Sequence, residues 1–168
     1  MNIIFRQATL SDFNGAWTAL DNARNMMISI GRKQWSASYP SQEILLCDIR
    51  EGHGYVLVSG EEVLAYAAVA LNGEPLYDDL DGHWLSESDY MVVHRLAVNT
   101  SHRGEGLSKR YFAEVENWAK SIGVNSIKVD TNHDNVEMLD MLPKIGYVYC
   151  GEVDYGVKGK RMAYEKLL

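Results

Sequence analysis

The residues best suited to chemistry lie in the stretch 92–111, where an apolar strand pattern runs through a short polar turn into an amphipathic helix pattern. Gly104 and Gly106 stand one residue apart just before the helix, and Arg103 and Lys109 add positive charge on either side. Glycine lets a ligand approach the backbone closely, while the first turn of a helix presents N–H groups and a partial positive charge. The pattern therefore predicts a cradle for an anion such as a pyrophosphate.

The glycine pair also has a simpler interpretation, a strand–helix turn in which both residues only satisfy backbone torsions. Two better-known phosphate motifs are excluded. No Gly-Lys-Ser/Thr follows at the spacing of a P-loop, and the three spaced glycines and ribose-binding acid of the dinucleotide fingerprint are not in place. No metal site is predicted, because the cysteines stand far apart and metal-ligand spacing is lacking at His53, His83, His102 and His133.

A histidine, His94, precedes the turn on the expected strand. Its side chain has the same strand parity as Val92, whereas Arg95 points the opposite way and is expected to be a structural ion-pair partner. The unperturbed pKa of histidine, about 6.5, suits general-base work. The alternative is a histidine packed into the sheet and bonded to a neighbouring backbone group.

Three segments of the chain share their spacing with one known family. Residues 103–108 match Gln/Arg-x-x-Gly-x-Gly/Ala except that Ser108, still small, takes the final position. Residues 135–147 match Asn-x-x-Ala followed by Tyr-x-x-x-Gly-Phe in spacing, and residues 5–12 match an Arg-x-Ala strand before an Asp-headed helix. In these segments the chain resembles the GNAT superfamily of N-acetyltransferases. The resemblance implies acetyl-CoA as co-substrate and transfer of its acetyl group to a primary amine.

For the co-substrate, the resemblance implies binding mainly by backbone groups. The N–H groups of residues 103–108 would hold the pyrophosphate, and the strand at Leu96 and Val98 would pair with the pantetheine arm like an added strand. The Leu96 N–H would also polarise the thioester carbonyl, which places it with His94 in the catalytic set. Asn135 would contact the pantetheine, act as a helix N-cap, or do both. The predicted cofactor-binding residues are Leu96, Ala97, Val98, Arg103, Gly104, Glu105, Gly106, Leu107, Ser108, Lys109 and Asn135.

Two family positions that often carry a proton-transfer group are inert in this chain. The strand position of a catalytic glutamate is Val92, and the helix position of a tyrosine acid is Leu142. Because alkyl amines are mostly protonated near neutral pH, a base must act before they attack, and His94 is the remaining candidate. The weaker candidates are Glu74, Asp130, Tyr77 and Tyr147, with Asp130 expected to be structural.

Aromatic loop residues indicate the acceptor side. Their rings could stack on an amine or hold a cation, and the acidic stretch 74–89 would attract one. The alternatives are rings that serve as core lids and acids that form a solvated face, and the solvated interpretation is favoured for the acids. The predicted substrate-binding residues are Trp35, Tyr39, Glu74, Tyr77 and Trp84.

Three functions remain open from the sequence. The leading one is an N-acetyltransferase for a small-molecule primary amine, working by direct attack in a ternary complex. The second is acetylation of a protein N-terminus or lysine, which aromatic and acidic loops disfavour because a peptide needs an open groove. The third is an acyl-CoA-binding sensor without turnover, which the inert residues Val92 and Leu142 keep open.

Composition sets the outer limits. The chain has 168 residues, against about 100–200 for a typical domain, so one domain over residues 1–168 is expected. A net charge of −7 disfavours nucleic acid as a partner, and two cysteines fit a reduced, cytoplasmic protein. The longest apolar stretch, residues 63–71, is about half of a membrane span, so no membrane association is expected. A homodimer is left open.

The periodicity of apolar residues predicts about seven strands and about four helices in an α/β (α+β mixed) domain. The resemblance to the GNAT superfamily implies that the strands form a central, mostly antiparallel twisted sheet with the helices at its sides. The first helix is expected to begin at Ser11 as N-cap and to end before Gly31. The other expected helices cover residues 41–51, 107–122 and 135–145. The expected strands cover residues 2–6, 55–58, 63–71, 90–98, 126–130, 147–150 and 161–166.

Overall fold

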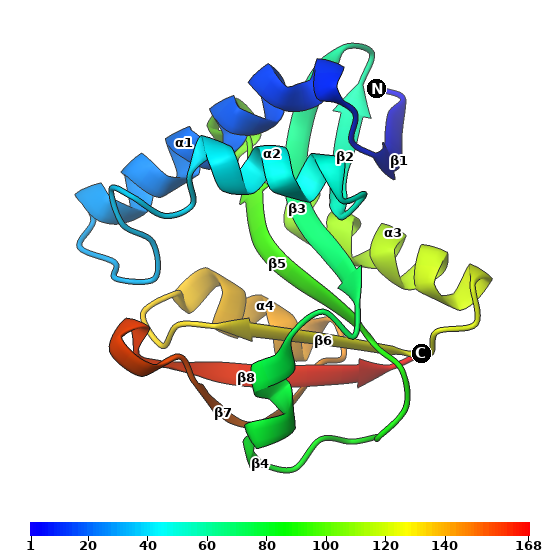
Figure 1. The fold of residues 1–168 in the computed structure, drawn as a ribbon. Helices are drawn as coiled ribbons and strands as arrows, with labels where there is room; N and C mark the ends of the chain where they lie inside the picture. Colours follow the sequence, from blue (N-terminus) through cyan, green and yellow to red (C-terminus); the bar gives the residue numbers. More distant parts are fainter. The chain divides into compact units, whose positions relative to one another are not determined.

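The computed structural model describes residues 1–168, and their contacts divide the chain into two compact units. The first unit contains residues 1–69 and 94–114, and the second contains residues 70–93 and 115–168. Strand β5 (Met91–Val98) and helix α3 (Leu107–Ser121) each contribute residues to both units (Figure 1).

In the first unit, strands follow the order β1-β2-β3-β5. β1 (Ile3–Gln7), β2 (Gly54–Ser59) and β3 (Glu62–Leu71) pair antiparallel, with a register shift between Leu57 and Val58. Helices α1 (Phe13–Ser29) and α2 (Gln42–Arg50) lie in front of β2 and β3 in Figure 1, and the start of α3 lies behind them. Short 3-10 turns occur at η1 (Leu10–Asp12) and η3 (Thr100–His102).

The start of α1 differs from the sequence-based expectation. Ser11 lies inside η1 and does not cap the helix, because the position before Phe13 is taken by Asp12. The Asp12 carboxylate accepts hydrogen bonds from the Arg6 guanidinium at 2.7 Å and from the Thr9 N–H at 2.8 Å. This ties the end of β1 to the first helical turn.

An apolar core fills the first unit between its helices and its sheet. Every third or fourth residue of α1 and α2 points into it, which is the spacing that predicted these helices. The buried members are Ala8, Ala16, Leu20, Met27, Trp35, Leu45, Ile49, Val56, Val58, Val63, Tyr66 and Ala97.

In the second unit, strands follow the order β5-β6-β8-β7-β4. The start of β5 pairs in parallel with β6 (Ser126–Thr131), and the remaining pairs are antiparallel, through β8 (Lys160–Leu167) and β7 (Val148–Asp154). This unit also contains α4 (Val136–Lys144), η2 (Pro75–Asp79) and η4 (Gly156–Lys158). A second cluster of buried residues comprises Tyr77, Tyr90, Val92, Val153 and Ala163.

The eighth strand, β4 (Asp81–Gly82), lies in the acidic stretch that was expected to be a loop. It pairs antiparallel with β7, with Gly82 opposite Gly151. A Cβ on Gly82 would overlap the carbonyl oxygen of Cys150, so this pairing depends on the absence of a side chain. Two residues without hydrophobic alternation give no strand signal, which explains why the expected count was about seven.

The α/β class, the mostly antiparallel sheet and the four α-helices are confirmed. None of the helices combines the length and the apolar composition needed to cross a bilayer.

Candidate active site

The turn before α3 has the open backbone that an anion cradle requires. Gly104 and Gly106 adopt left-handed conformations, with φ of 86° and 75°. A Cβ at either position would find no heavy atom within 4 Å, and both residues are exposed. The Arg110 N–H bonds to the Gly106 carbonyl at 3.1 Å, so the helix begins immediately after the glycines. Its first N–H groups have no partner within the helix, and nothing packs over the two glycines.

A histidine anchors this turn to the sheet of the first unit. His102 contacts Glu62, at the start of β3, through Nε2 at 2.9 Å, and contacts Glu105 through Nδ1 at 3.2 Å. Hydrogen bonds to Glu62 and then to Glu105 raise the pKa of His102. The Glu105 carboxylate is therefore engaged with a side chain of its own turn.

The other loop side chains contribute unequally. Leu107 is buried, so only its backbone is available to a ligand, whereas Lys109 is exposed and Ser108 is half-buried. Arg103 is exposed and its Nη1 lies 2.9 Å from the sulfur of Met26 in α1. The turn thus combines exposed cations with open backbone, and its binding of an anion stays a prediction.

Strand β5 departs from regular geometry just before the predicted oxyanion donor. Arg95 has a φ of 57°, which is uncommon for a residue other than glycine. It lies between His94 and Leu96, and its conformation sets the direction of the next peptide group. Strain of this kind persists only where the surroundings hold it in place.

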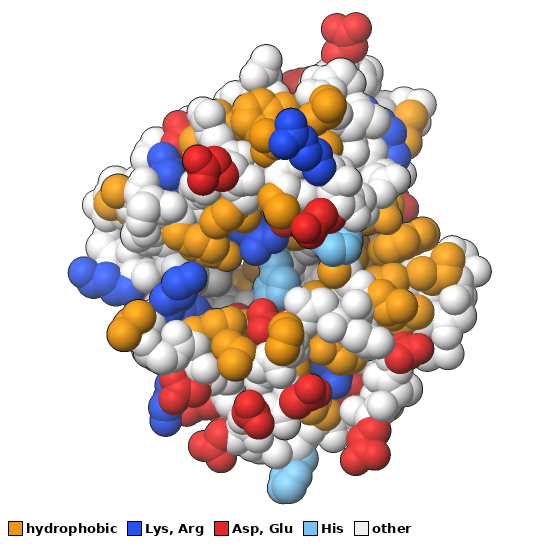
Figure 2. All heavy atoms as spheres, viewed as in Figure 1, with side chains coloured by type: hydrophobic (Ala, Val, Ile, Leu, Met, Phe, Trp, Pro, Cys, Tyr) orange, Lys and Arg blue, Asp and Glu red, His pale blue; other side chains and the backbone are white.

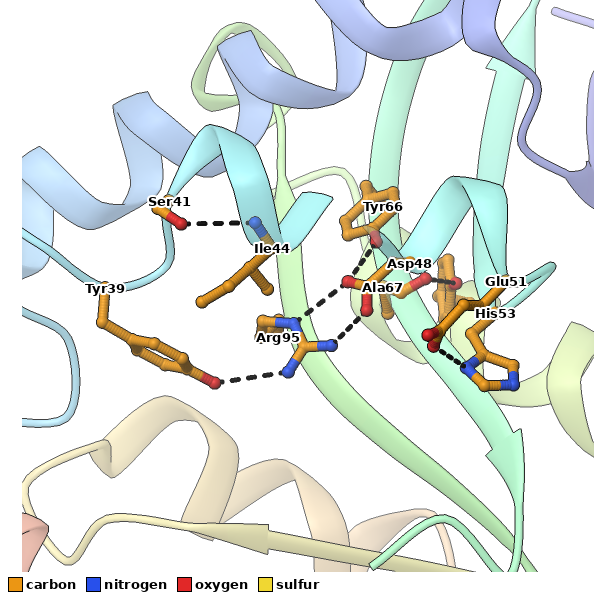
Figure 3. A network of polar contacts seen from close by, with 10 residues as sticks. Tyr39, Ser41, Ile44, Asp48, Glu51, His53, Tyr66, Ala67 and Arg95 are labelled. Carbon is orange, nitrogen blue, oxygen red and sulfur yellow. Dashed lines mark hydrogen bonds and ion pairs between the residues drawn. The ribbon is translucent and has the colours of Figure 1, made fainter. Parts of the chain in front are cut away.

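A buried polar network in the first unit holds Arg95 (Figure 3). Its guanidinium donates two hydrogen bonds to Asp48, from Nη2 at 2.6 Å and from Nε at 3.2 Å, and a third to the hydroxyl of Tyr39 at 3.3 Å. The Tyr66 hydroxyl donates at 2.7 Å to Asp48 Oδ2, the oxygen that also accepts from Arg95 Nε. Burial lowers the pKa of Arg95, but the charge of Asp48 and the interactions with Tyr39 together outweigh burial and raise the pKa above its ordinary value. Arg95 is therefore a structural ion-pair partner, as predicted.

His94 is half-buried on β5, whereas Val92 is fully buried. Of the weaker proton-transfer candidates, Tyr147 is buried and its hydroxyl donates to Glu116 at 3.1 Å. Burial, followed by the Glu116 charge, raises the pKa of Tyr147, which makes its proton harder to remove. Asp130 accepts hydrogen bonds from two tyrosine hydroxyls, at 2.7 Å each, in keeping with its expected structural role.

The five predicted acceptor residues divide between the two units. Trp35 is only 6% exposed and belongs to the apolar core of the first unit, so it matches the alternative of a core residue. Tyr39 is half-buried and its hydroxyl accepts from Arg95. Glu74, Tyr77 and Trp84 are brought together in the second unit, where they line one cavity of about 550 Å³.

Hydrogen bonds hold the aromatic residues that line this cavity. The Tyr77 hydroxyl donates to Asp130, and the Trp84 indole N–H donates to the Tyr77 carbonyl at 2.8 Å. The two rings lie 5.0 Å apart between centroids, and Tyr90 stands 5.9 Å from Tyr77. Acidic side chains gather in the lower part of Figure 2, over the stretch that contains η2 and β4 in Figure 1.

Asn135 belongs to the second unit and occupies the N-cap position of α4. Its side chain does not cap the helix. Its Nδ2 donates instead to the hydroxyl of Thr131 at 3.1 Å. Asn135 therefore stands at the N-cap position, as one of the two predicted roles requires, but its side chain does not make the capping hydrogen bond.

Sequence reasoning missed three residues that shape these sites. Asp48 lies between Leu45 and Ile49 on the buried face of α2, and a carboxylate among apolar positions was the available signal. Lys128 and Tyr90 also line the cavity of the second unit. A lysine in a strand is usually expected to face solvent, so nothing in the sequence indicated that Lys128 is buried.

No group of three or more His, Cys, Asp or Glu side chains is arranged to hold a metal ion. That the chain works without a metal stays a prediction.

The α/β fold and the open glycine turn at the start of α3 agree with the acyltransferase class that the sequence resembles. The model of the acetyltransferase (GNAT) family matches residues 18–147. The chain therefore belongs to the GNAT family of acetyltransferases, enzymes that transfer an acyl group from acetyl-CoA.

Solved structures agree with this assignment. A GNAT-family acetyltransferase from Streptococcus agalactiae is 29% identical with a TM-score of 0.88, and the match covers 99% of this chain and 95% of that one. One from Listeria monocytogenes is 19% identical with a TM-score of 0.77, covering 99% and 95%. The PaiA N-acetyltransferase of Thermoplasma acidophilum, solved with coenzyme A, is 15% identical with a TM-score of 0.66 over the whole of both chains. A search of curated proteins gave no match.

Proposed function

We propose that the whole chain, residues 1–168, is one acetyltransferase domain that acetylates a small-molecule primary amine. The observation that carries the acceptor class is the cavity of the second unit. It combines the rings of Tyr77 and Trp84 with Glu74, a set suited to a cationic amine of small size. A cavity of about 550 Å³ falls in the range of small-molecule sites, which favours such an acceptor over a peptide.

Acetyl-CoA binds, in this proposal, to the backbone of residues 103–108 and to β5. The open space at Gly104 and Gly106 supports a pyrophosphate contact, and the exposed Lys109 adds charge. Leu96, Ala97 and Val98 pair with the pantetheine arm through their backbone, and Asn135 contacts the same arm.

The chemical step is a direct attack. His94 takes a proton from the ammonium of the acceptor, directly or through water. The amine nitrogen then forms a bond to the thioester carbon while the Leu96 N–H stabilises the carbonyl oxygen. The carbon–sulfur bond breaks, the nitrogen releases its second proton to become the amide nitrogen, and the thiolate of coenzyme A leaves and takes up one proton. The Arg95 conformation, fixed by Asp48, supports an N–H at Leu96 that is oriented before the substrate arrives.

Release of free thiol from acetyl-CoA, measured across a panel of small amines, tests this function. We expect turnover with at least one small amine and none with peptides that carry a free N-terminus or lysine. His94→Gln should lower kcat by about 100-fold or more near neutral pH while changing the acetyl-CoA dissociation constant little. Acetyl-CoA binding without thiol release from any amine would favour the sensor function, and peptide turnover alone would favour the protein acetyltransferase.

A further inference from the structure

The cavity of the second unit contains a buried cation that the proposed function does not use. Lys128, on β6, is only 4% exposed, and it lines the cavity. Its ammonium nitrogen lies 4.2 Å from the ring centroid of Trp84 and 4.1 Å from that of Tyr90. Both rings line the same cavity, so the cation is held between two aromatic walls.

This ammonium has no hydrogen-bond acceptor and no carboxylate at ion-pair distance. A lysine ammonium carries three N–H donors, and aromatic faces replace only part of the water that it loses on burial. Burial lowers the pKa of Lys128, while the charges of Glu165, which lies opposite Lys128 in the β6–β8 pairing, and of Cys150 and Asp78 act in the opposite direction. Unsatisfied donors facing a cavity are the feature that an oxygen-bearing ligand would complete.

The rest of the cavity has the opposite charge. Its lining includes four carboxylates, of which three are exposed and Glu74 is half-buried. The deepest charged group is thus positive and the outer ones are negative. The four acidic residues are Glu74, Asp78, Glu87 and Asp89.

This distribution discriminates between ligand classes. A plain diamine would satisfy the acids but leave Lys128 facing another cation. A phosphate would satisfy Lys128 but would carry up to two negative charges past the acidic lining. A small molecule with one carboxylate and one ammonium group satisfies both regions.

We propose that the cavity binds a free amino acid, with its carboxylate on the Lys128 ammonium and its amino group toward the acidic lining. The inference rests on the proposed function only for the ligand's role as the acetyl acceptor, because binding itself requires no turnover. The aromatic pair Trp84 and Tyr90 then serves two purposes: it fixes the lysine and provides an apolar wall for the ligand side chain.

Calorimetry on the full chain without acetyl-CoA tests the proposal. The probes are the twenty standard amino acids, each paired with the amine that lacks its carboxylate, for example lysine with cadaverine and tyrosine with tyramine. The variants are Lys128→Met, Lys128→Arg and Asp78→Asn. The matched control is Lys120→Met, which removes the charge of an exposed lysine on α3.

We expect at least one amino acid to bind about 10- to 100-fold tighter than its paired amine, the difference that one charge-assisted hydrogen bond provides. Lys128→Met should abolish this preference, while Lys128→Arg should retain part of it and Lys120→Met all of it. Asp78→Asn should weaken both members of a pair. If Lys128→Met does not fold, the proposal is still tested by the preference of the native chain for amino acids over their paired amines. The effects of Lys128→Arg and Asp78→Asn test it as well.

The proposal is overturned if no amino acid binds, if paired amines bind equally well, or if the preference survives in Lys128→Met. Thiol release separates the two hypotheses. Turnover of plain amines without a carboxylate preference would leave the proposed function intact and remove this inference. Binding of amino acids without turnover would retain the site and remove their role as acceptors.

Discussion

The buried pair of Asp48 and Arg95 gives the sharpest stability prediction. Asp48→Asn keeps the size of the side chain but leaves the Arg95 guanidinium buried without its counter-charge. The two side chains are 10% and 16% exposed, and their shortest contact is 2.6 Å. Loss of one partner of such a pair costs about 3–5 kcal/mol. With a slope of about 2 kcal/mol per molar urea, the unfolding midpoint should fall by about 2 M.

Urea unfolding followed by circular dichroism measures this loss. Glu114→Gln is the matched control in the same unit, because the Glu114–Arg110 pair is 3.8 Å long with side chains 33% and 43% exposed. It should change the unfolding free energy by less than about 0.5 kcal/mol. The double variant Asp48→Leu/Arg95→Met should be more stable than Asp48→Asn alone, since no buried charge is left unpaired. An unfolding free energy for Asp48→Asn within about 1 kcal/mol of the native value would refute this account of β5.

Three further predictions concern other polar groups. The Arg6 hydrogen bond lowers the pKa of Asp12 from 3.8 to about 2. This interaction should therefore contribute about 1–2 kcal/mol to the unfolding free energy above pH 4, and the contribution should be lost as pH falls toward 2. Acid titrations of Asp12→Asn should lack this loss. Because the pKa of His102 is raised, its contact with Glu62 should stabilise the glycine turn fully below the ordinary histidine pKa and weaken as pH rises through the raised value. Between pH 5 and 9 the thermal unfolding temperature should decline, and His102→Gln should abolish this decline. Glu165 is fully buried and accepts three hydrogen bonds. In urea unfolding, Glu165→Ala should lower the unfolding free energy by about 3 kcal/mol. A loss below about 1 kcal/mol would contradict a stabilising role for these hydrogen bonds.

The sequence correctly predicted those elements whose patterns depend only on residues near one another in the chain. Helical spacing of apolar residues and the Gly104–Gly106 pair are readable without tertiary contacts, so four helices and the open turn could be predicted. The resemblance to the family added predicted roles for backbone groups, such as the Leu96 N–H, and these roles stay predictions. The ion-pair role of Arg95 followed from strand parity.

What could not be predicted depends on contacts between distant segments. The strand at Asp81 exists only because Glu152 pairs with it, and the burial of Lys128 depends on the stretch that contains Trp84. The left-handed φ of Arg95 occurs together with an ion pair to a carboxylate 47 residues away in the sequence. Trp35 could equally have been a binding residue or a core residue, and only the packing of the first unit decides for the core.

Acetyl-CoA binding to Gly106→Glu, measured by calorimetry beside the native chain, is the most direct test of the central claim that open backbone at the start of α3 holds the pyrophosphate. Gly123→Glu is the matched control, because Gly123 follows the other end of α3 with a φ of 81° and has the same open space where a Cβ would stand. We predict that Gly106→Glu lowers the affinity at least about 100-fold, through steric exclusion and charge repulsion, while Gly123→Glu binds like the native chain. Equal affinity in all three proteins would contradict the assignment of this turn.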